Sequence, residues 1–338
     1  IGGTVTVKNR SRETLRDLRA GLKVESYMDA ATEGPALPSL APGASAQLEL
    51  RAVLNTKVLE LQEDLPVQAR VDVSYTGSGG RQTEATGASF TLHRRTALVW
   101  DETGKLASFV TPNEDTVASF ASRAVAAAPP AASAAAAPVG AAWRLPPRLL
   151  RAMRVCDTLG AYGIVYVEDP DSPISRILGQ PTAVDMVRFP RDTLEQRTGD
   201  CDDTTALLAA ALEAVGVRTA LMTSPGHVFL AFDTGDPEGN LWLFTEDGRQ
   251  AIGHDGTVWL PVETTALAQG FSVAWRKAGE LLVRHKGQTE FLPLRELRGR
   301  FPPLPLPAAR VGIVDPPSAR VETLSAASRG DLEASLYA

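Results

Sequence analysis

The strongest constraint on the fold is a period-two alternation of apolar and polar residues in the first hundred positions. It is clearest over residues 67–75 (VQARVDVSY), which a glycine-rich turn at residues 77–80 follows. The same alternation occurs in four other places: residues 5–7, 18–24, 47–50 and 88–92. Successive side chains of a strand point to opposite faces, so short alternating runs divided by turns predict an antiparallel β-sandwich over residues 1–98.

The rest of the chain differs in charge and in pattern. Residues 1–98 carry 12 basic and 11 acidic side chains, whereas the remainder holds the excess acid of a chain whose net charge is −6. Residues 115–125 have a helical rhythm, and residues 126–142 are almost wholly alanine with three prolines, which break helices. We therefore expect four parts: a sandwich (1–98), a helical and Ala/Pro-rich connector (99–144), a second domain (145–300), and a Pro-rich, partly helical tail (301–338).

Composition excludes several functional classes. The acidic balance disfavours non-specific binding to nucleic acid, which needs a positive face. Two cysteines cannot form a disulfide framework or a four-thiolate zinc site. No apolar run approaches the length that spans a bilayer, so no transmembrane segment is expected. The chain begins at Ile1 rather than methionine, so we expect a mature or shortened form.

The two cysteines lie in different patterns. Pro146 and Pro147 begin a predicted helix through Leu159, in which Leu150, Met153 and Cys156 share one apolar stripe, so Cys156 is expected in the core. A short strand is predicted at residues 163–167, followed by a Pro/Asp-rich loop at 169–171.

Cys201 opens a second predicted helix. Asp200 and Asp203 form an N-cap pattern, and Gly216 stands where the helix should stop. The apolar stripe of this helix comprises Leu207, Leu208, Ala211, Leu212 and Val215. The helix N-terminus favours a thiolate, whereas Asp200, Asp202 and Asp203 raise the pKa of the thiol, so an active Cys201 requires a cationic partner, an imidazolium.

His227 is the histidine that suits this role. Strands are predicted at residues 218–222, 227–233, 241–244 and 258–265, with His227 at the start of the second and Glu263 in the last. A cysteine at a helix start, a histidine at a strand start and a later carboxylate form the order of nucleophile, base and orienter.

These blocks resemble the core of transglutaminase-like cysteine proteins, which share a papain-like fold. The similar segments are residues 199–203 (GDCDD), the helix ending at Val215-Gly216-Val217, residues 225–229 (PGHVF) and residues 259–264 (WLPVET). The resemblance, which covers about residues 145–279, implies an α+β domain in which a Cys-bearing helix packs on an antiparallel sheet. It also implies a triad of Cys201, His227 and Glu263, although the family usually has aspartate at the third position. Asp200, Asp202, Asp203, Gly226 and Trp259 are the expected substrate-binding or site-shaping residues.

The expected function is therefore thiol-dependent acyl transfer, or hydrolysis of an amide or peptide bond, on a protein or peptide substrate. A catalytically silent protein-binding module, using an immunoglobulin-like sandwich and the papain-like groove, is the alternative. No cofactor or metal is expected, because Cys201, His227 and His254 lack close metal-ligand spacing and no phosphate-binding glycine loop is present. His93, His254 and His285 are expected to face solvent. By analogy with bacterial proteins of similar architecture, an extracytoplasmic location is expected.

Overall fold

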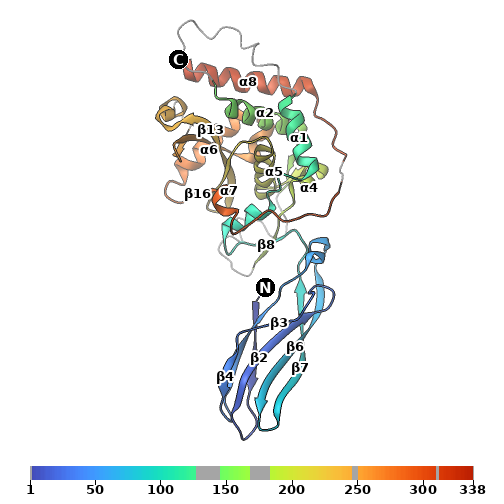
Figure 1. Ribbon diagram of the computed structural model, residues 1–338. Coiled ribbons are helices and arrows are strands. Elements are labelled where there is room, and N and C mark those ends of the chain that lie inside the picture. The colour runs from blue at the N-terminus through green and yellow to red at the C-terminus, as the bar shows by residue number, and fades with distance from the viewer. Residues whose placement is uncertain (1, 127–144, 168–182, 246–249, 310–311, 338) are drawn as a thin grey trace. The chain divides into compact units, whose positions relative to one another are not determined.

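The computed structural model describes residues 2–126, 145–167, 183–245, 250–309 and 312–337 (Figure 1). The chain divides into two compact units, residues 1–95 and 96–338. The predicted Ala/Pro-rich segment of the connector and the predicted loop at 169–171 lie outside the described residues.

The first unit is built from antiparallel sheets, as the alternation predicts. Its strands are β1 (Gly2–Lys8), β2 (Leu15–Val24), β3 (Thr32–Glu33), β4 (Leu37–Leu40), β5 (Ser45–Arg51), β6 (Leu65–Gly77) and β7 (Gly80–Leu92). One sheet has the order β3-β2-β6-β7 with β4 also paired to β2, and β1 pairs with β5 in another. Apolar side chains from both sheets, such as Leu18, Leu48 and Val71, form one core. The turn predicted at 77–80 closes the β6–β7 hairpin, in which Gly77 opposes Gly80.

The second unit is a mixed α+β structure. Its strands are β8 (Ala97–Val99), β9 (Val165–Tyr166), β10 (Val184–Met186), β11 (Thr198–Gly199), β12 (Thr219–Ser224), β13 (His227–Pro237), β14 (Ile252–His254), β15 (Thr257–Val262) and β16 (Glu290–Pro293). Its α-helices are α1 (Asp115–Ala126), α2 (Pro147–Tyr162), α4 (Pro190–Gln196), α5 (Cys201–Ala214), α6 (Phe271–Arg284), α7 (Leu294–Leu297) and α8 (Ser318–Tyr337). The 3-10 helices include η4 (Glu238–Phe244) and η5 (Thr264–Gln269).

A five-stranded antiparallel sheet of order β14-β15-β13-β12-β16 positions the site. Leu221, Leu230 and Leu260 on one face of the sheet share a core with α2 and α5. Met222, Phe229 and Trp259 on the other face pack with Ala278 of α6. The sheet is therefore buried between helices, and α5 is central: its residues 201–212 are buried all round, whereas the sequence predicted one apolar stripe.

Three predicted strands are wrong or shortened. The strand predicted at residues 258–265 ends at Val262 as β15, and Glu263, predicted to lie in it, is the N-cap of η5. The strand predicted at residues 241–244 is part of the 3-10 helix η4, because the pairing of β13 with β15 breaks its register between Asp233 and Pro237 and the chain turns away from the sheet. β14 takes the edge position instead. The strand predicted at 163–167 is reduced to β9. In α2, Cys156 is in the core as expected, but Leu150 of the predicted stripe is only partly buried, and Leu149 is buried in its place.

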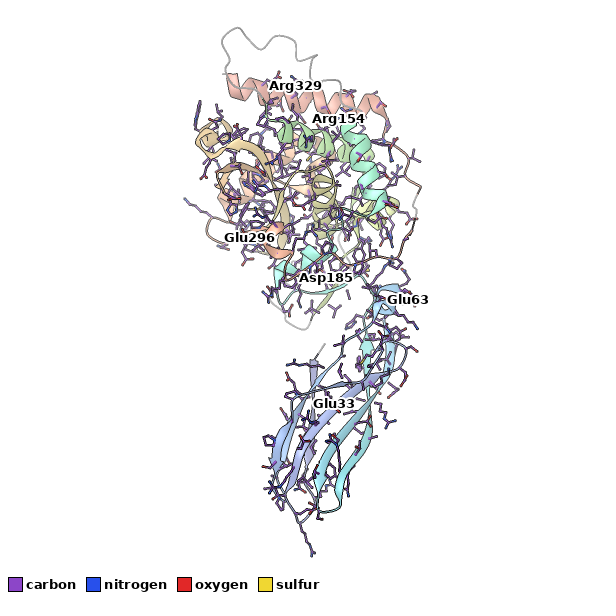
Figure 2. All side chains as sticks on the ribbon, in the orientation of Figure 1. Glu33, Glu63, Arg154, Asp185, Glu296 and Arg329 are labelled. Atoms are coloured by element: carbon purple, nitrogen blue, oxygen red, sulfur yellow. The ribbon has the colours of Figure 1, made fainter. Side chains whose placement is uncertain are left out.

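The C-terminal segment ends in α8, which packs on α2 and α6 (Figure 1). Arg154 of α2, labelled in Figure 2, lies beneath α8. It donates to Glu322 and to Ser325 of α8, at 2.7 and 3.1 Å. Ser328 donates to the buried carboxyl of Asp157 at 2.9 Å. The predicted tail therefore packs as part of the second unit. None of the described helices is long and apolar enough to cross a membrane.

Candidate functional site

Cys201 occupies the first turn of α5, as the sequence predicts. Asp200 is the N-cap, and its side chain accepts a hydrogen bond from the N–H of Asp203 at 3.5 Å. Thr204 reinforces this turn by donating its hydroxyl to the carbonyl of Asp200 at 2.7 Å. Only 2% of Cys201 is exposed, so the thiol sits below the surface rather than on it.

The surroundings of Cys201 favour the neutral thiol. Burial raises its pKa well above the ordinary value, and the charges of Asp202 and Asp200 raise it further. The backbone of Val228 lowers the pKa of the thiol but does not offset burial. The sequence argument that the neighbouring aspartates oppose a thiolate is thus correct in direction. Thr205 of the same helix donates its hydroxyl to the carbonyl of Val228 at 3.5 Å, which joins α5 to the residue that follows His227.

His227 begins β13 and is bonded to Glu263. Gly226, at φ +70°, forms the left-handed turn that leads into the strand. His227 Nε2 lies 2.7 Å from Glu263 Oε2, with 24% of the histidine side chain and 7% of the glutamate side chain exposed. The structure therefore joins the predicted base and the predicted orienter directly.

Thr265 holds the other oxygen of Glu263. Its N–H and its hydroxyl both donate to Glu263 Oε1, at 3.0 and 2.6 Å, so that Oε2 is left for His227. Burial alone raises the pKa of Glu263, but the bonds from His227 and Thr265 outweigh it, and the net pKa is lowered. Sequence reasoning did not identify Thr265. The signal was present, since an acidic residue two positions before a threonine at a helix start is a side-chain cap.

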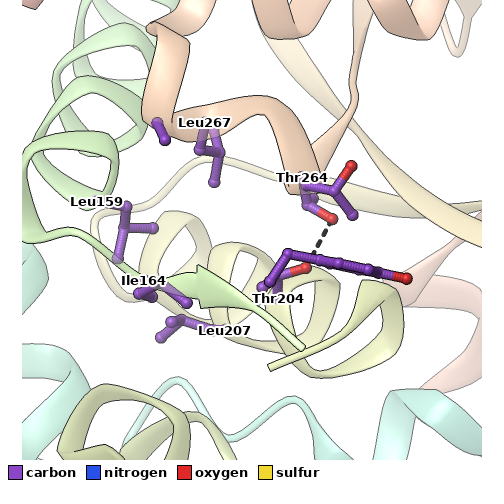
Figure 3. A pocket seen from close by; sticks show the side chains of 9 residues that line it. Leu159, Ile164, Thr204, Leu207, Thr264 and Leu267 are labelled. Carbon is purple, nitrogen blue, oxygen red and sulfur yellow. Dashed lines mark hydrogen bonds between the residues drawn. The ribbon is translucent and has the colours of Figure 1, made fainter. Parts of the chain in front are cut away.

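A pair of hydroxyl contacts fixes the two halves of the site to each other. Thr264 Oγ1 lies 3.0 Å from Thr204 Oγ1 and 3.0 Å from Thr205 Oγ1, which joins η5 to the first turns of α5. Thr204 and Thr264 border a small cavity of about 20 Å³, enough for one water molecule. Leu159, Ile164, Tyr166, Leu207, Thr265, Leu267 and Ala268 complete its lining, and Figure 3 shows the Thr204–Thr264 contact at its edge.

The three aspartates around Cys201 form a buried cluster, in which one oxygen from each lies within 4.8 Å of the others. Burial and the charge of Asp200 raise the pKa of Asp203 from 3.8 to about 7, although Arg188 lowers it by donating its backbone N–H, at 2.6 Å, and its guanidinium to the two carboxylate oxygens. Asp202 has its pKa raised well above the ordinary value by burial and by a hydrogen bond with Asp200, an arrangement in which one of the two carboxyls keeps its proton. Arg188 thus offsets part of the acid at this helix start, and burial favours the protonated form of Asp202. The role of Arg188 was not predicted.

Two predicted or considered residues are not brought to Cys201. Trp259 opposes Asp233 on the neighbouring strand, six residues along β13 from His227 and about 20 Å away at the usual strand rise. Its indole N–H donates to the carbonyl of His254 at 3.1 Å. His254 is only partly exposed, and its ring lies 4.9 Å from that of Phe291, so it does not simply face solvent.

Comparison with known proteins returned no match: no family model, curated protein or solved structure is similar to this chain.

Proposed function

We propose that the second unit is a transglutaminase-like, papain-like domain that performs thiol-dependent acyl transfer or amide hydrolysis on a protein or peptide substrate. The first unit is proposed to be an immunoglobulin-like sandwich. One arrangement carries this proposal: the 2.7 Å bond between His227 and Glu263, with His227 on β13, a strand that packs against α5, whose first residue is Cys201. These are the positions that the resemblance assigns to base, orienter and nucleophile.

The histidine tautomer follows from the geometry. Glu263 accepts a hydrogen bond at Nε2, so in neutral His227 this nitrogen carries the proton and Nδ1 is the basic nitrogen. Because Cys201 rests as a thiol, the proton must leave during attack rather than before it. His227 Nδ1 takes that proton as the sulfur adds to the carbonyl carbon, and Glu263 stabilises the imidazolium that forms.

The remaining steps conserve atoms and charge. The C–N bond of the tetrahedral intermediate breaks, the departing amine takes the proton back from His227, and a thioester remains on Cys201. Water or a second amine then attacks the thioester and gives its proton to His227. The C–S bond of this second intermediate breaks, which releases a carboxylic acid or a new amide, and His227 returns the proton to the departing sulfur. The backbone N–H of Cys201, in the first turn of α5, is the proposed oxyanion donor.

A catalytically silent binding module is the second candidate, and two observations favour it. Cys201 is almost fully buried, and burial keeps its thiol protonated. A working nucleophile has to be reached by its substrate, whereas a structural cysteine does not.

Thiol reactivity separates the two candidates. We expect iodoacetamide to alkylate Cys201 faster than the buried Cys156, as measured by peptide mass mapping, and we expect the His227→Ala variant to slow this reaction at least tenfold. Amine incorporation into casein, followed with a fluorescent amine, and casein hydrolysis then test turnover, with Cys201→Ala as the matched control. If Cys201 alkylates no faster than Cys156, or at the same rate in wild type and His227→Ala, the acyl-transfer proposal is wrong.

A further inference from the structure

The strand β7 of the first unit forms an open edge of its sheet. The order β3-β2-β6-β7 places β7 last, and among the residues that the structure describes it pairs only with β6 (Figure 1). Residues 80–89 are all exposed, so both faces of the strand meet solvent along this stretch. A strand in this position presents a row of backbone N–H and C=O groups to which another strand can add.

β7 lacks the features by which natural edge strands avoid such pairing. The other ends of the two five-stranded sheets are β3, β14 and β16, which have two, three and four residues, and β16 ends in Pro293. β7 instead has thirteen residues in one unbroken register with β6, without a bulge or a proline. Its only charged side chains are those of Arg81 and Glu84. Long, regular and nearly uncharged edges are the ones most open to a further strand.

The β6–β7 hairpin determines which backbone groups of β7 are directed outward. Gly77 opposes Gly80 across a two-residue loop, so this pair exchanges both of its hydrogen bonds. Hydrogen-bonded pairs alternate with non-hydrogen-bonded pairs along an antiparallel ladder, and the even-numbered residues of β7 therefore bond to β6. The odd-numbered residues, from Arg81 to Thr91, direct their N–H and C=O groups away from β6.

A second copy of β7, running antiparallel to the first, satisfies these outward groups. When Thr86 lies opposite Thr86 of the second copy, every odd-numbered residue opposes another odd-numbered residue, and the side chains of each face stay on that face. The hydrogen-bonded pairs are then Ala85 with Gly87, Thr83 with Ser89, and Arg81 with Thr91, each formed twice. Together these pairs exchange about twelve hydrogen bonds.

Charge favours this self-pairing and this register. Registers centred on Arg81 or on Glu84 place like charges opposite each other, which destabilises a strand pair. The register centred on Thr86 places both charged residues opposite neutral ones, Thr91 and Ala88. Residues 1–98 carry 12 basic and 11 acidic side chains, so the net charges of two first units do not oppose their approach.

We propose that the protein forms a two-fold dimer in which the β7 strands of two copies pair antiparallel about Thr86 and join their sheets into one. This inference is independent of the proposed function, because it uses no residue of the second unit. Two paired strand edges bury less area than a standard protein–protein interface, so we expect a dissociation constant of about 10 μM.

Sedimentation velocity of the full chain over a range of concentrations tests the proposal. The mass should rise from 35.9 kDa toward twice that value as the concentration passes about 10 μM. Thr86→Glu places two carboxylates opposite each other, on the same face as Glu84 of both copies, and should weaken association about tenfold. Thr6→Glu is the matched control, because it makes the same change at an exposed position of β1, and it should leave association unchanged.

Mixing Thr86→Glu with Thr86→Lys distinguishes repulsion across the interface from damage to the strand. The lysine of one copy then lies opposite the glutamate of the other, so the mixture should associate more tightly than either variant alone. A monomer at every concentration up to about 100 μM would overturn the proposal and leave the edge to a strand of another protein. A dimer that Thr86→Glu does not weaken, that Thr6→Glu weakens equally, or that the mixture does not restore would overturn it as well.

Discussion

Replacing Asp157 by asparagine should change how the stability of the second unit depends on pH. Asp157 lies on α2 and is fully buried, and its Oδ1 accepts hydrogen bonds from the N–H of Phe271 and the hydroxyl of Ser328, both at 2.9 Å. Burial raises the pKa of this carboxyl from 3.8 to about 6, although both hydrogen bonds act to lower it. The carboxyl thus joins α2, α6 and α8 at an electrostatic cost.

The sign of the effect follows from the direction of the shift. Because the folded-state pKa exceeds the unfolded-state pKa, folding favours the protonated carboxyl, and this stabilisation is complete below pH 3.8 and is lost as the pH rises through about 6. A difference of about two pKa units corresponds to about 3 kcal/mol. Roughly 1.5 kcal/mol of this is lost between pH 5 and pH 8.

The Asp157→Asn variant keeps an acceptor at Oδ1 and has no charge to titrate. The free energy of unfolding of the wild type should therefore fall by about 1.5 kcal/mol relative to the variant between pH 5 and pH 8. Urea unfolding followed by tryptophan fluorescence measures this, because all five tryptophans follow residue 95 and so report on the second unit. Packing differences between amide and carboxyl do not vary with pH, so the test is how steeply the free energy of unfolding changes with pH.

Asp315→Asn is the control, because it removes a carboxylate whose side chain is 63% exposed in the same unit. We expect the free energy of unfolding of this variant to change with pH in the same way as that of the wild type. Parallel curves for Asp157→Asn would show that burial does not penalise the ionised carboxyl, and the reasoning would be refuted.

Three other outcomes are expected. Thr265→Val removes the hydroxyl bond to Glu263 and should lower any Cys201-dependent rate about tenfold, with Thr265→Ser restoring it; unchanged rates in the valine variant would remove Thr265 from the mechanism. Asp233→Ala leaves Arg148 and Arg218 without their buried partner. It should lower the free energy of unfolding, measured in urea, by about 2 kcal/mol, which is less than for a fully buried ion pair because both arginines are partly exposed. A decrease under about 0.5 kcal/mol would contradict this. Gly160→Ala should lower the free energy of unfolding by about 1–3 kcal/mol, because its Cβ would lie 2.1 Å from a backbone carbonyl oxygen of η5. Gly330→Ala in α8, where a Cβ has nothing within 4 Å, should raise it by up to about 1 kcal/mol. Equal effects of the two variants would show that the chain around Gly160 moves aside without loss of stability.

Local patterns predicted much of the architecture. The alternation in the first hundred residues, the glycine-rich turn at 77–80, the Asp200 cap and the stop at Gly216 each depend on residues within a few positions of one another. A short apolar run such as residues 241–244 does not distinguish a strand from a helical turn. In the structure this run follows the register shift between Asp233 and Pro237 and forms part of η4.

Contacts between distant residues could not be predicted in this way. Arg188, which precedes α4, donates to Asp203 of α5. Trp259 pairs with Asp233 and therefore lies several residues along β13 from His227. The pairing of His227 with Glu263 was expected from the order of the motifs, and the structure gives it a bond length. Burial of Cys201 on all sides depends on how α5 packs within the unit, which its apolar stripe alone did not indicate.

The docking of α8 on α2 has a consequence for how the protein is made. The Ser328 hydroxyl and the Asp157 carboxyl that it binds are 171 residues apart in the chain. Synthesis proceeds from the N-terminus, so the first unit has all its strands available to fold while the second is still emerging. The second unit, by contrast, cannot close over Asp157 until α8 has left the ribosome. Chains released early would retain the Cys201 segment but lack the helix that covers α2.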